Sequence, residues 1–207
     1  MAREKKGEQM YKKCKTERSR KRQNQIEQAF LKLLSQKNFD DITVSELSSF
    51  ANIPRKAFYR YFETKEGVLH ALIDHTLQGY EEYYQATKKE KRTIIGDLET
   101  YFSFWLTEPR TSLLIALKKS DLIDCLYKYS KDLADSGFIN TSRFLPNEDL
   151  WSQKQIFNFA ITGLMTIMLD WFEDGCKQST KEMAELSKRI LSSPLFPNLE
   201  ELGILKE

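Results

Sequence analysis

Apolar residues recur at intervals of three and four positions along most of this chain, which is the spacing of an amphipathic helix. Strand-like alternation of apolar and polar positions is absent from the sequence. The pattern therefore predicts an all-helical (all-α) protein. The first helix is predicted at 17–36, with a buried stripe formed by Ile26, Ala29, Phe30, Leu33 and Leu34.

A capping-box pattern marks the start of a second, short helix. The Thr43 hydroxyl and the Glu46 carboxylate are three residues apart, so each can bond a free backbone N–H group at the helix start. This helix is expected to reach about Phe50.

An asparagine and a proline mark the start of a third helix. Asn52 tolerates a left-handed turn, and Pro54 suits a first helical turn, so a helix is predicted from Pro54 to about Phe62. Thr64 is suited to cap a fourth helix that continues toward Tyr84. Further helices are predicted at about 93–107, 110–118, 121–136, 149–174 and 180–192, with loops around 137–147 and at 174–175.

Charge is distributed unevenly along the 207 residues. Residues 1–22 contain ten Lys and Arg against three Glu, a net charge of +7, whereas the whole chain carries +2. A positive N-terminal segment on a negative body is suited to a polyanion such as nucleic acid or a membrane surface. The alternative is a solvated, flexible extension that binds nothing.

Several classes of site are not expected from the sequence. The three cysteines are widely spaced and form no C-x-x-C motif, which argues against a disulfide framework or a zinc site. His70 and His75 are badly spaced for two metal ligands, and no phosphate loop or nucleophile elbow is present, so we expect no metal, cofactor or catalytic site. Without a run of eighteen apolar residues, and with a highly charged N-terminus, the chain is expected to be soluble and cytoplasmic.

Two short helices behind a longer one match a helix-turn-helix arrangement. On the third helix, Phe58 and Phe62 are four residues apart and should face inward. Arg55, Lys56 and Tyr59 should project to the other side, where cations and a hydroxyl can reach phosphates and base edges. An ordinary amphipathic helix with a solvated basic face is the alternative, but the capped helix before it and the basic N-terminus favour DNA binding.

The segments FDDITVSEL (39–47), NIPRKAFYRYF (52–62) and TKEGVL (64–69) resemble the N-terminal signature of the TetR family of bacterial transcriptional regulators. The resemblance covers 17–80 closely and is one of architecture beyond it. It implies a three-helix DNA-binding domain followed by a helical ligand-binding and dimerisation domain. The expected divisions are a basic extension at 1–16, the DNA-binding domain at 17–64, the effector and dimerisation domain at 65–193 and a tail at 194–207.

The resemblance also implies roles for individual residues in binding DNA. Family members often have glycine where Lys56 stands and threonine where Ala57 stands, so these positions bear on the operator sequence. The residues implied are Thr43, Ser45, Tyr59, Tyr61 and Lys65 for phosphates, Arg55, Lys56 and Ala57 for bases, and Arg20 and Arg22 for an arm along the DNA.

The C-terminal half carries two further expectations. The segment 158–172 has hardly any polar face, which favours a homodimer interface over the alternative of a fully buried internal helix. Aromatic residues crowd the middle of the chain, where the resemblance implies a small-molecule cavity, although each ring is also a candidate for ordinary core packing. The interface candidates are Ile161, Leu164, Met165, Met168, Trp171 and Phe172, and the cavity candidates are Tyr101, Trp105 and Tyr129.

These observations predict a regulator that binds a palindromic operator as a homodimer and is a repressor released by a small-molecule effector. One alternative is a similar regulator without small-molecule control, acting as an activator or through a protein partner. Another is a helical module that uses its basic N-terminus on RNA or a membrane surface.

Overall fold

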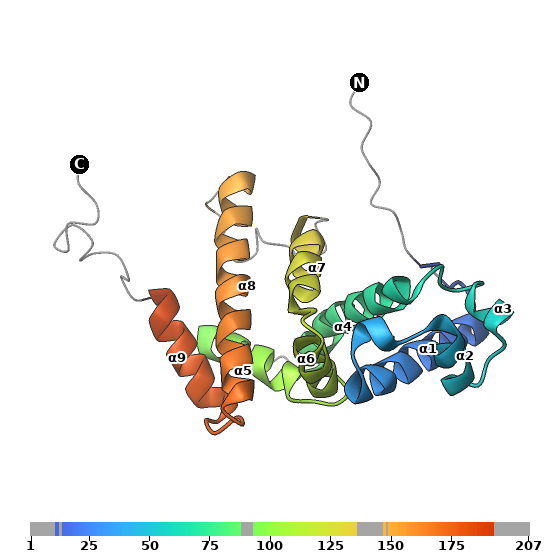
Figure 1. Ribbon diagram of the computed structural model, residues 1–207. Coiled ribbons are helices and arrows are strands. Elements are labelled where there is room, and N and C mark those ends of the chain that lie inside the picture. Colours follow the sequence, from blue (N-terminus) through green and yellow to red (C-terminus); the bar gives the residue numbers. More distant parts are fainter. Residues whose placement is uncertain (1–10, 13, 88–92, 136–146, 148, 193–207) are drawn as a thin grey trace, which may run out of the picture. The chain divides into compact units, whose positions relative to one another are not determined.

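The structure is a computed structural model that describes residues 11, 12, 14–87, 93–135, 147 and 149–192. Within these residues the regular elements are helical, and one isolated antiparallel bridge joins Tyr11 to Phe62. The expectation of an all-α fold is confirmed. In chain order the elements are α1 (Glu17–Gln36), η1 (Phe39–Asp41), α2 (Val44–Phe50), α3 (Arg55–Phe58), α4 (Lys65–Thr87), α5 (Ile94–Trp105), α6 (Arg110–Lys119), α7 (Ile123–Asp135), α8 (Leu150–Glu173) and α9 (Thr180–Ser192) (Figure 1).

The chain forms two compact units. The first comprises residues 1–81 and 108–132, and the second comprises 82–107 and 133–207. Helix α4 contributes to both, and Gly79 lies in it close to the boundary at a point where an added Cβ would meet no atom within 4 Å. The sequence predicted a boundary between the DNA-binding domain and the effector domain at 64/65. That boundary concerns function and not compactness, so it stays a prediction. The expected loop at 137–147 lies largely outside the described residues, as do the tail at 194–207 and most of the extension at 1–16.

The core of the first unit forms around α1, whose predicted stripe is buried. Helix α1 packs against α2 and α6, and the Phe30 ring meets Phe39 edge-on with centroids 6.1 Å apart. The ammonium of Lys119 in α6 donates to the carbonyl of Ser35 at 3.1 Å, which adds a polar tie to the apolar contact of the two helices. The elements that carry the DNA-binding candidates are therefore packed on the apolar core around α1.

The second unit is built from α5, α8 and α9, with the last residues of α4. The Phe102 ring of α5 meets Trp171 of α8 edge-on at 5.6 Å, and the Trp171 indole donates to the carbonyl of Gln178 at 3.1 Å. Tyr84 from α4 donates to Asp97 at 2.8 Å. Helix α8 is also long and apolar enough to cross a membrane, and only 17% of its apolar stretch is buried within the protein.

Candidate nucleic-acid interface

A tight turn joins α2 to α3. Asn52 takes a left-handed conformation with φ of 51°, as expected, and the N–H of Ile53 donates to the carbonyl of Ser48 at 2.9 Å. Gln25 of α1 donates from its side-chain amide to the carbonyl of Ala51 at 2.7 Å. These bonds fix the start of α3 relative to α1 and α2.

The start of α2 is capped, but not by the full capping box. The Thr43 hydroxyl accepts from the N–H of Glu46 at 3.2 Å, as predicted. The Glu46 carboxylate instead accepts from the ammonium of Lys37 at 2.6 Å, and this bond holds the pKa of Glu46 below its ordinary value. The prediction of a reciprocal box is wrong because the carboxylate takes a charged partner at the end of α1.

The third helix is shorter than predicted. Its α-helical part ends at Phe58, and the chain then continues in tighter turns, in which Arg60 donates to Ala57 at 3.2 Å and Tyr61 donates to Phe58 at 2.9 Å. The N–H of Phe62 still donates to the carbonyl of Phe58 at 3.1 Å, and Phe62 also forms the bridge with Tyr11. The expected helix end at Phe62 is wrong because bonds between residues three apart replace the regular α-helical bonds after Phe58.

The two sides of this segment differ as the sequence predicted. Phe58 and Phe62 are 0% and 1% exposed, with ring centroids 5.7 Å apart. Arg55, Lys56 and Tyr59 are exposed. The Arg55 guanidinium donates to the Tyr59 hydroxyl at 3.2 Å and lies 5.8 Å from the centre of its ring. The outward face therefore presents cations whose geometry is partly set before any ligand binds.

The flanking candidates lie around this face within the first unit. Ser45 is exposed near the start of α2, whereas Ala57 and Tyr61 are half-buried. The ammonium of Lys65, at the start of α4, donates to the carbonyls of Phe39 and Asp40 at 2.8 and 3.0 Å. Lys65 is therefore a tie between α4 and η1, a contact that the sequence did not predict.

Gln25 connects the basic start of α1 to the turn between α2 and α3 by hydrogen bonds. Arg22 donates to the side-chain oxygen of Gln25 at 3.0 Å, and Gln25 in turn bonds the turn at Ala51. Arg20 is exposed and donates weakly to the carbonyl of Lys15 at 3.5 Å. Arg22 consequently stands beside the helix-turn-helix, on the same unit as α3.

The sequence did not predict a polar cluster in which His75 and Asp74 of α4 bond Glu27 and Tyr11. His75 lies 3.1 Å from a carboxylate oxygen of Glu27, which is 3% exposed in its side chain, and this bond raises the pKa of His75. Tyr11 donates to Asp74, and burial raises the pKa of the phenol. These partners are far apart in sequence, so helical spacing gave no sign of the cluster.

The predicted dimer residues divide into two groups on α8. Met165, Met168 and Trp171 are buried within the second unit, so they belong to its own core. Ile161, Leu164 and Phe172 are half-buried. The more exposed apolar residues of α8 lie nearer its start, and they are Leu150, Trp151, Ile156 and Phe159.

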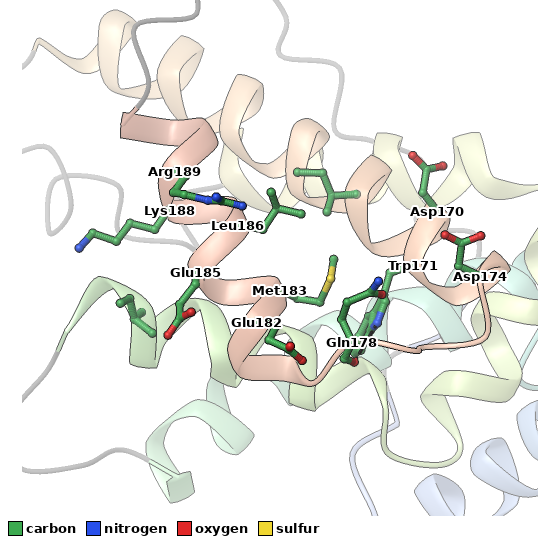
Figure 2. A pocket seen from close by; sticks show the side chains of 12 residues that line it. Asp170, Trp171, Asp174, Gln178, Glu182, Met183, Glu185, Leu186, Lys188 and Arg189 are labelled. Carbon is green, nitrogen blue, oxygen red and sulfur yellow. Dashed lines mark hydrogen bonds between the residues drawn. The ribbon is translucent and has the colours of Figure 1, made fainter.

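The aromatic cavity candidates pack as core residues. Tyr101 and Trp105 are 7% and 2% exposed in the second unit, whereas Tyr129 belongs to the first, where its ring meets His70 at 4.8 Å. An open groove of about 850 Å³ lies instead along α8 and α9, as Figure 2 shows, and neither Tyr101 nor Trp105 lines it. Its walls include four carboxylates, from Asp170, Asp174, Glu182 and Glu185.

The N-terminal and C-terminal parts of the chain each match a family of known transcriptional regulators. Residues 27–72 match the family described as bacterial regulatory proteins, tetR family, and residues 110–193 match a transcriptional regulator C-terminal region. The HTH-type transcriptional regulator EthR of Mycolicibacterium smegmatis is 33% identical over 86 residues. That alignment covers 39% of this chain and 40% of EthR.

Solved structures share the fold across most of the chain. The fatty acid degradation regulator FadR from Bacillus halodurans superposes with a TM-score of 0.60 at 17% identity, covering 89% of this chain and 99% of that one. A tetR-family transcriptional regulator from Streptomyces coelicolor gives 0.55 at 17% identity over 89% and 86%. The dihydroxyacetone kinase operon activator DhaS gives 0.53 at 15% identity over 90% and 98%.

Proposed function

Because this chain belongs to the TetR family of bacterial transcriptional regulators, we propose that it binds a palindromic DNA operator as a homodimer through α3. The observation that carries the proposal is the division of α3 into two faces. Phe58 fastens the segment to the core, while Arg55, Lys56 and Tyr59 are exposed on a basic outer surface. Such a helix can enter the major groove with its cations toward base edges.

We assign base reading to the start of α3. The planar guanidinium of Arg55 can donate twice to a guanine, and its bond to Tyr59 restricts it before DNA arrives. Lys56 is the second candidate for a base or phosphate contact. The half-buried Ala57 has a methyl group suited to a thymine methyl.

Phosphate contacts are proposed for the residues around that face. The Thr43 hydroxyl accepts from a backbone N–H and can donate its hydrogen to a phosphate oxygen, and Ser45 and Tyr61 offer further hydroxyls. An ammonium has three hydrogens, so Lys65 can bond a phosphate beside its two carbonyl partners. Arg20 and Arg22 extend this basic surface along α1.

Dimerisation is proposed to occur through α8 and its neighbour α9. One recognition helix binds weakly, and a dimer joins two half-sites about one helical turn apart. The exposed side chains of Trp151 and Phe159, at 71% and 67%, form an apolar surface that a second copy can cover. A lipid bilayer is the competing occupant, but Met165 and Trp171 on the same helix are committed to the protein core.

We also propose that a small molecule releases the protein from DNA. Tyr101 and Trp105 remain the candidates for contact with this effector. We propose that the protein is a repressor and that it acts in the cytoplasm. The alternative is a regulator that acts as an activator or through a protein partner. DhaS has a similar fold and is described as an operon activator, which supports keeping this alternative.

Footprinting tests the proposed function. The protein is applied to duplexes from around its own gene, and protection of a palindromic site is the expected result. A dimer should protect two half-sites together. Binding that ignores sequence would overturn operator recognition, and binding restricted to RNA or to anionic vesicles would favour the module that uses its basic N-terminus.

A screen of small molecules separates the two regulatory alternatives. We expect at least one compound to raise the melting temperature and to release the operator in the same concentration range. A Trp105→Phe variant should weaken that response while the operator affinity without ligand stays unchanged. A compound that binds without releasing DNA would contradict effector control.

A further inference from the structure

Tyr11 is a buried residue in a segment that the sequence presents as a charged extension. Its side chain is packed against Phe62, with ring centroids 6.5 Å apart, and edge-on against His75 at 5.5 Å. Its hydroxyl donates to Asp74, whose carboxylate also accepts from Gln78. The residue is only 9% exposed. An aromatic anchor with a satisfied hydroxyl fixes the chain at this point.

The backbone beside Tyr11 is tied to the end of the recognition segment. Tyr11 forms the antiparallel bridge with Phe62, and the N–H of Lys12 donates to the carbonyl of Tyr61 at 3.1 Å. Tyr61 is one of the proposed phosphate contacts. Lys12 is therefore joined through its backbone to Tyr61 on the proposed DNA-binding face, and its charged side chain is exposed.

The other end of this segment is fixed as well. Thr16 caps α1 through a reciprocal box with Ser19, in which its hydroxyl accepts from the Ser19 N–H at 3.2 Å. Lys15 and Arg18, on either side of the cap, are exposed. Tyr11 and Thr16 are each held by contacts within the first unit, so the neighbouring cations Lys12, Lys15 and Arg18 need little further ordering when they bind.

We propose that Tyr11 is a positioning residue that fastens a second phosphate-binding strip, formed by Lys12, Lys15 and Arg18, beside the recognition segment. The strip takes the sugar-phosphate backbone of duplex DNA next to the half-site that α3 reads. This inference rests on the proposed function of α3. It goes beyond that function because the strip adds affinity for every duplex and takes no part in reading bases.

A double-mutant cycle tests the proposal on the full-length protein. One variant is Tyr11→Ala, and a second carries Lys12→Gln, Lys15→Gln and Arg18→Gln together. Operator and random duplexes are titrated at several salt concentrations. For Tyr11→Ala we expect about tenfold weaker binding to both duplexes at low salt, and a salt slope smaller by about 1 for each phosphate that the strip no longer neutralises. In the neutralised background, Tyr11→Ala should have no further effect.

Two further measurements distinguish positioning from loss of folding. Tyr11→Phe keeps the ring and removes only the bond to Asp74, so it should retain most of the salt slope. Circular dichroism and melting curves establish whether each variant is folded. An unchanged salt slope in folded Tyr11→Ala overturns the inference, and so does an equal weakening in the neutralised background. A wild-type protein that binds no duplex would instead overturn the proposed function of α3.

Discussion

The ammonium nitrogen of Lys65 lies 2.8 Å from the carbonyl oxygen of Phe39 and 4.4 Å from the centre of the same residue's ring. One cation thus joins the start of α4 to η1 through a charged hydrogen bond and a cation–π contact. A residue expected to bind phosphate also holds the DNA-binding unit together.

Replacing Lys65 should therefore affect both folding and DNA binding. In Lys65→Met the aliphatic part is kept and the two carbonyls lose their charged donor, so we expect the free energy of unfolding to fall by about 1 kcal/mol. Urea unfolding measures this change. Lys32→Met, an exposed lysine of α1, is the control and should unfold as the wild type does. Equal stability of Lys65→Met and the wild type would show that the tie contributes nothing.

Arg55 and Tyr59 should fail in different ways. Arg55→Ala removes a candidate donor to base edges, so we expect a loss of about 1–3 kcal/mol on the operator and a smaller loss on random DNA. Tyr59→Ala removes a proposed phosphate contact and should weaken binding to both duplexes, with a small additional loss on the operator because Arg55 loses the hydroxyl that restricts it. Competitive titration with the two duplexes measures the ratio. An equal loss on both for Arg55→Ala would exclude base reading at this position.

His75 should give the protein a pH-dependent stability. Its pKa is raised above 6.5, chiefly by the hydrogen bond to Glu27, so the native state binds the proton more tightly than the unfolded chain. The stabilisation is complete below about pH 6 and is lost as the pH rises through the raised pKa. Since 42% of the side chain is exposed, solvent screening limits the effect to below about 1 kcal/mol.

Unfolding of His75→Gln across the pH range measures this contribution. The wild type should be the more stable protein near pH 5.5, and the difference should shrink toward pH 9, with Glu27, Asp74 and Tyr11 as the neighbouring titratable groups. His70→Gln is the matched control. Burial lowers the pKa of His70, so its replacement should instead help at low pH. A pH-independent difference for His75→Gln would contradict the assignment.

Phe159 should matter for association and little for the fold of one protomer. It is 67% exposed, so Phe159→Glu should remove an apolar contact with the proposed second copy without opening the core. We expect sedimentation equilibrium to show a shift from dimer to monomer. Ile115→Glu on α6, where the isoleucine is 58% exposed, is the control and should leave the dimer intact. A dimer that tolerates Phe159→Glu would place the interface elsewhere.

Local patterns predicted the helices and the two faces of α3 well. The helix at 17–36 was found because its apolar stripe and its start are written in neighbouring residues, and α1 spans these same residues. Asn52 and Pro54 located the turn for the same reason. Phe58 and Phe62 were correctly expected to be buried because they lie four positions apart on one side.

Contacts between distant residues were not predictable in this way. Tyr11 and Asp74 are 63 positions apart, so nothing near Tyr11 showed that it would be buried and would form a bridge with Phe62. Glu46 satisfied a capping pattern but found Lys37, which only the packing of α1 and α2 brings near. The apolar run on α8 could not show which side faces its own unit, because both sides are apolar.

Gly79 gives α4 an adjustable stiffness where the helix passes from one compact unit to the other. Glycine weakens a helix by about 1 kcal/mol relative to alanine, and a methyl group at this point would touch nothing within 4 Å. A single Gly79→Ala change could therefore strengthen the link while leaving every side-chain contact in place. The stiffness of α4 near residue 79 is therefore set by one position that takes part in no side-chain packing.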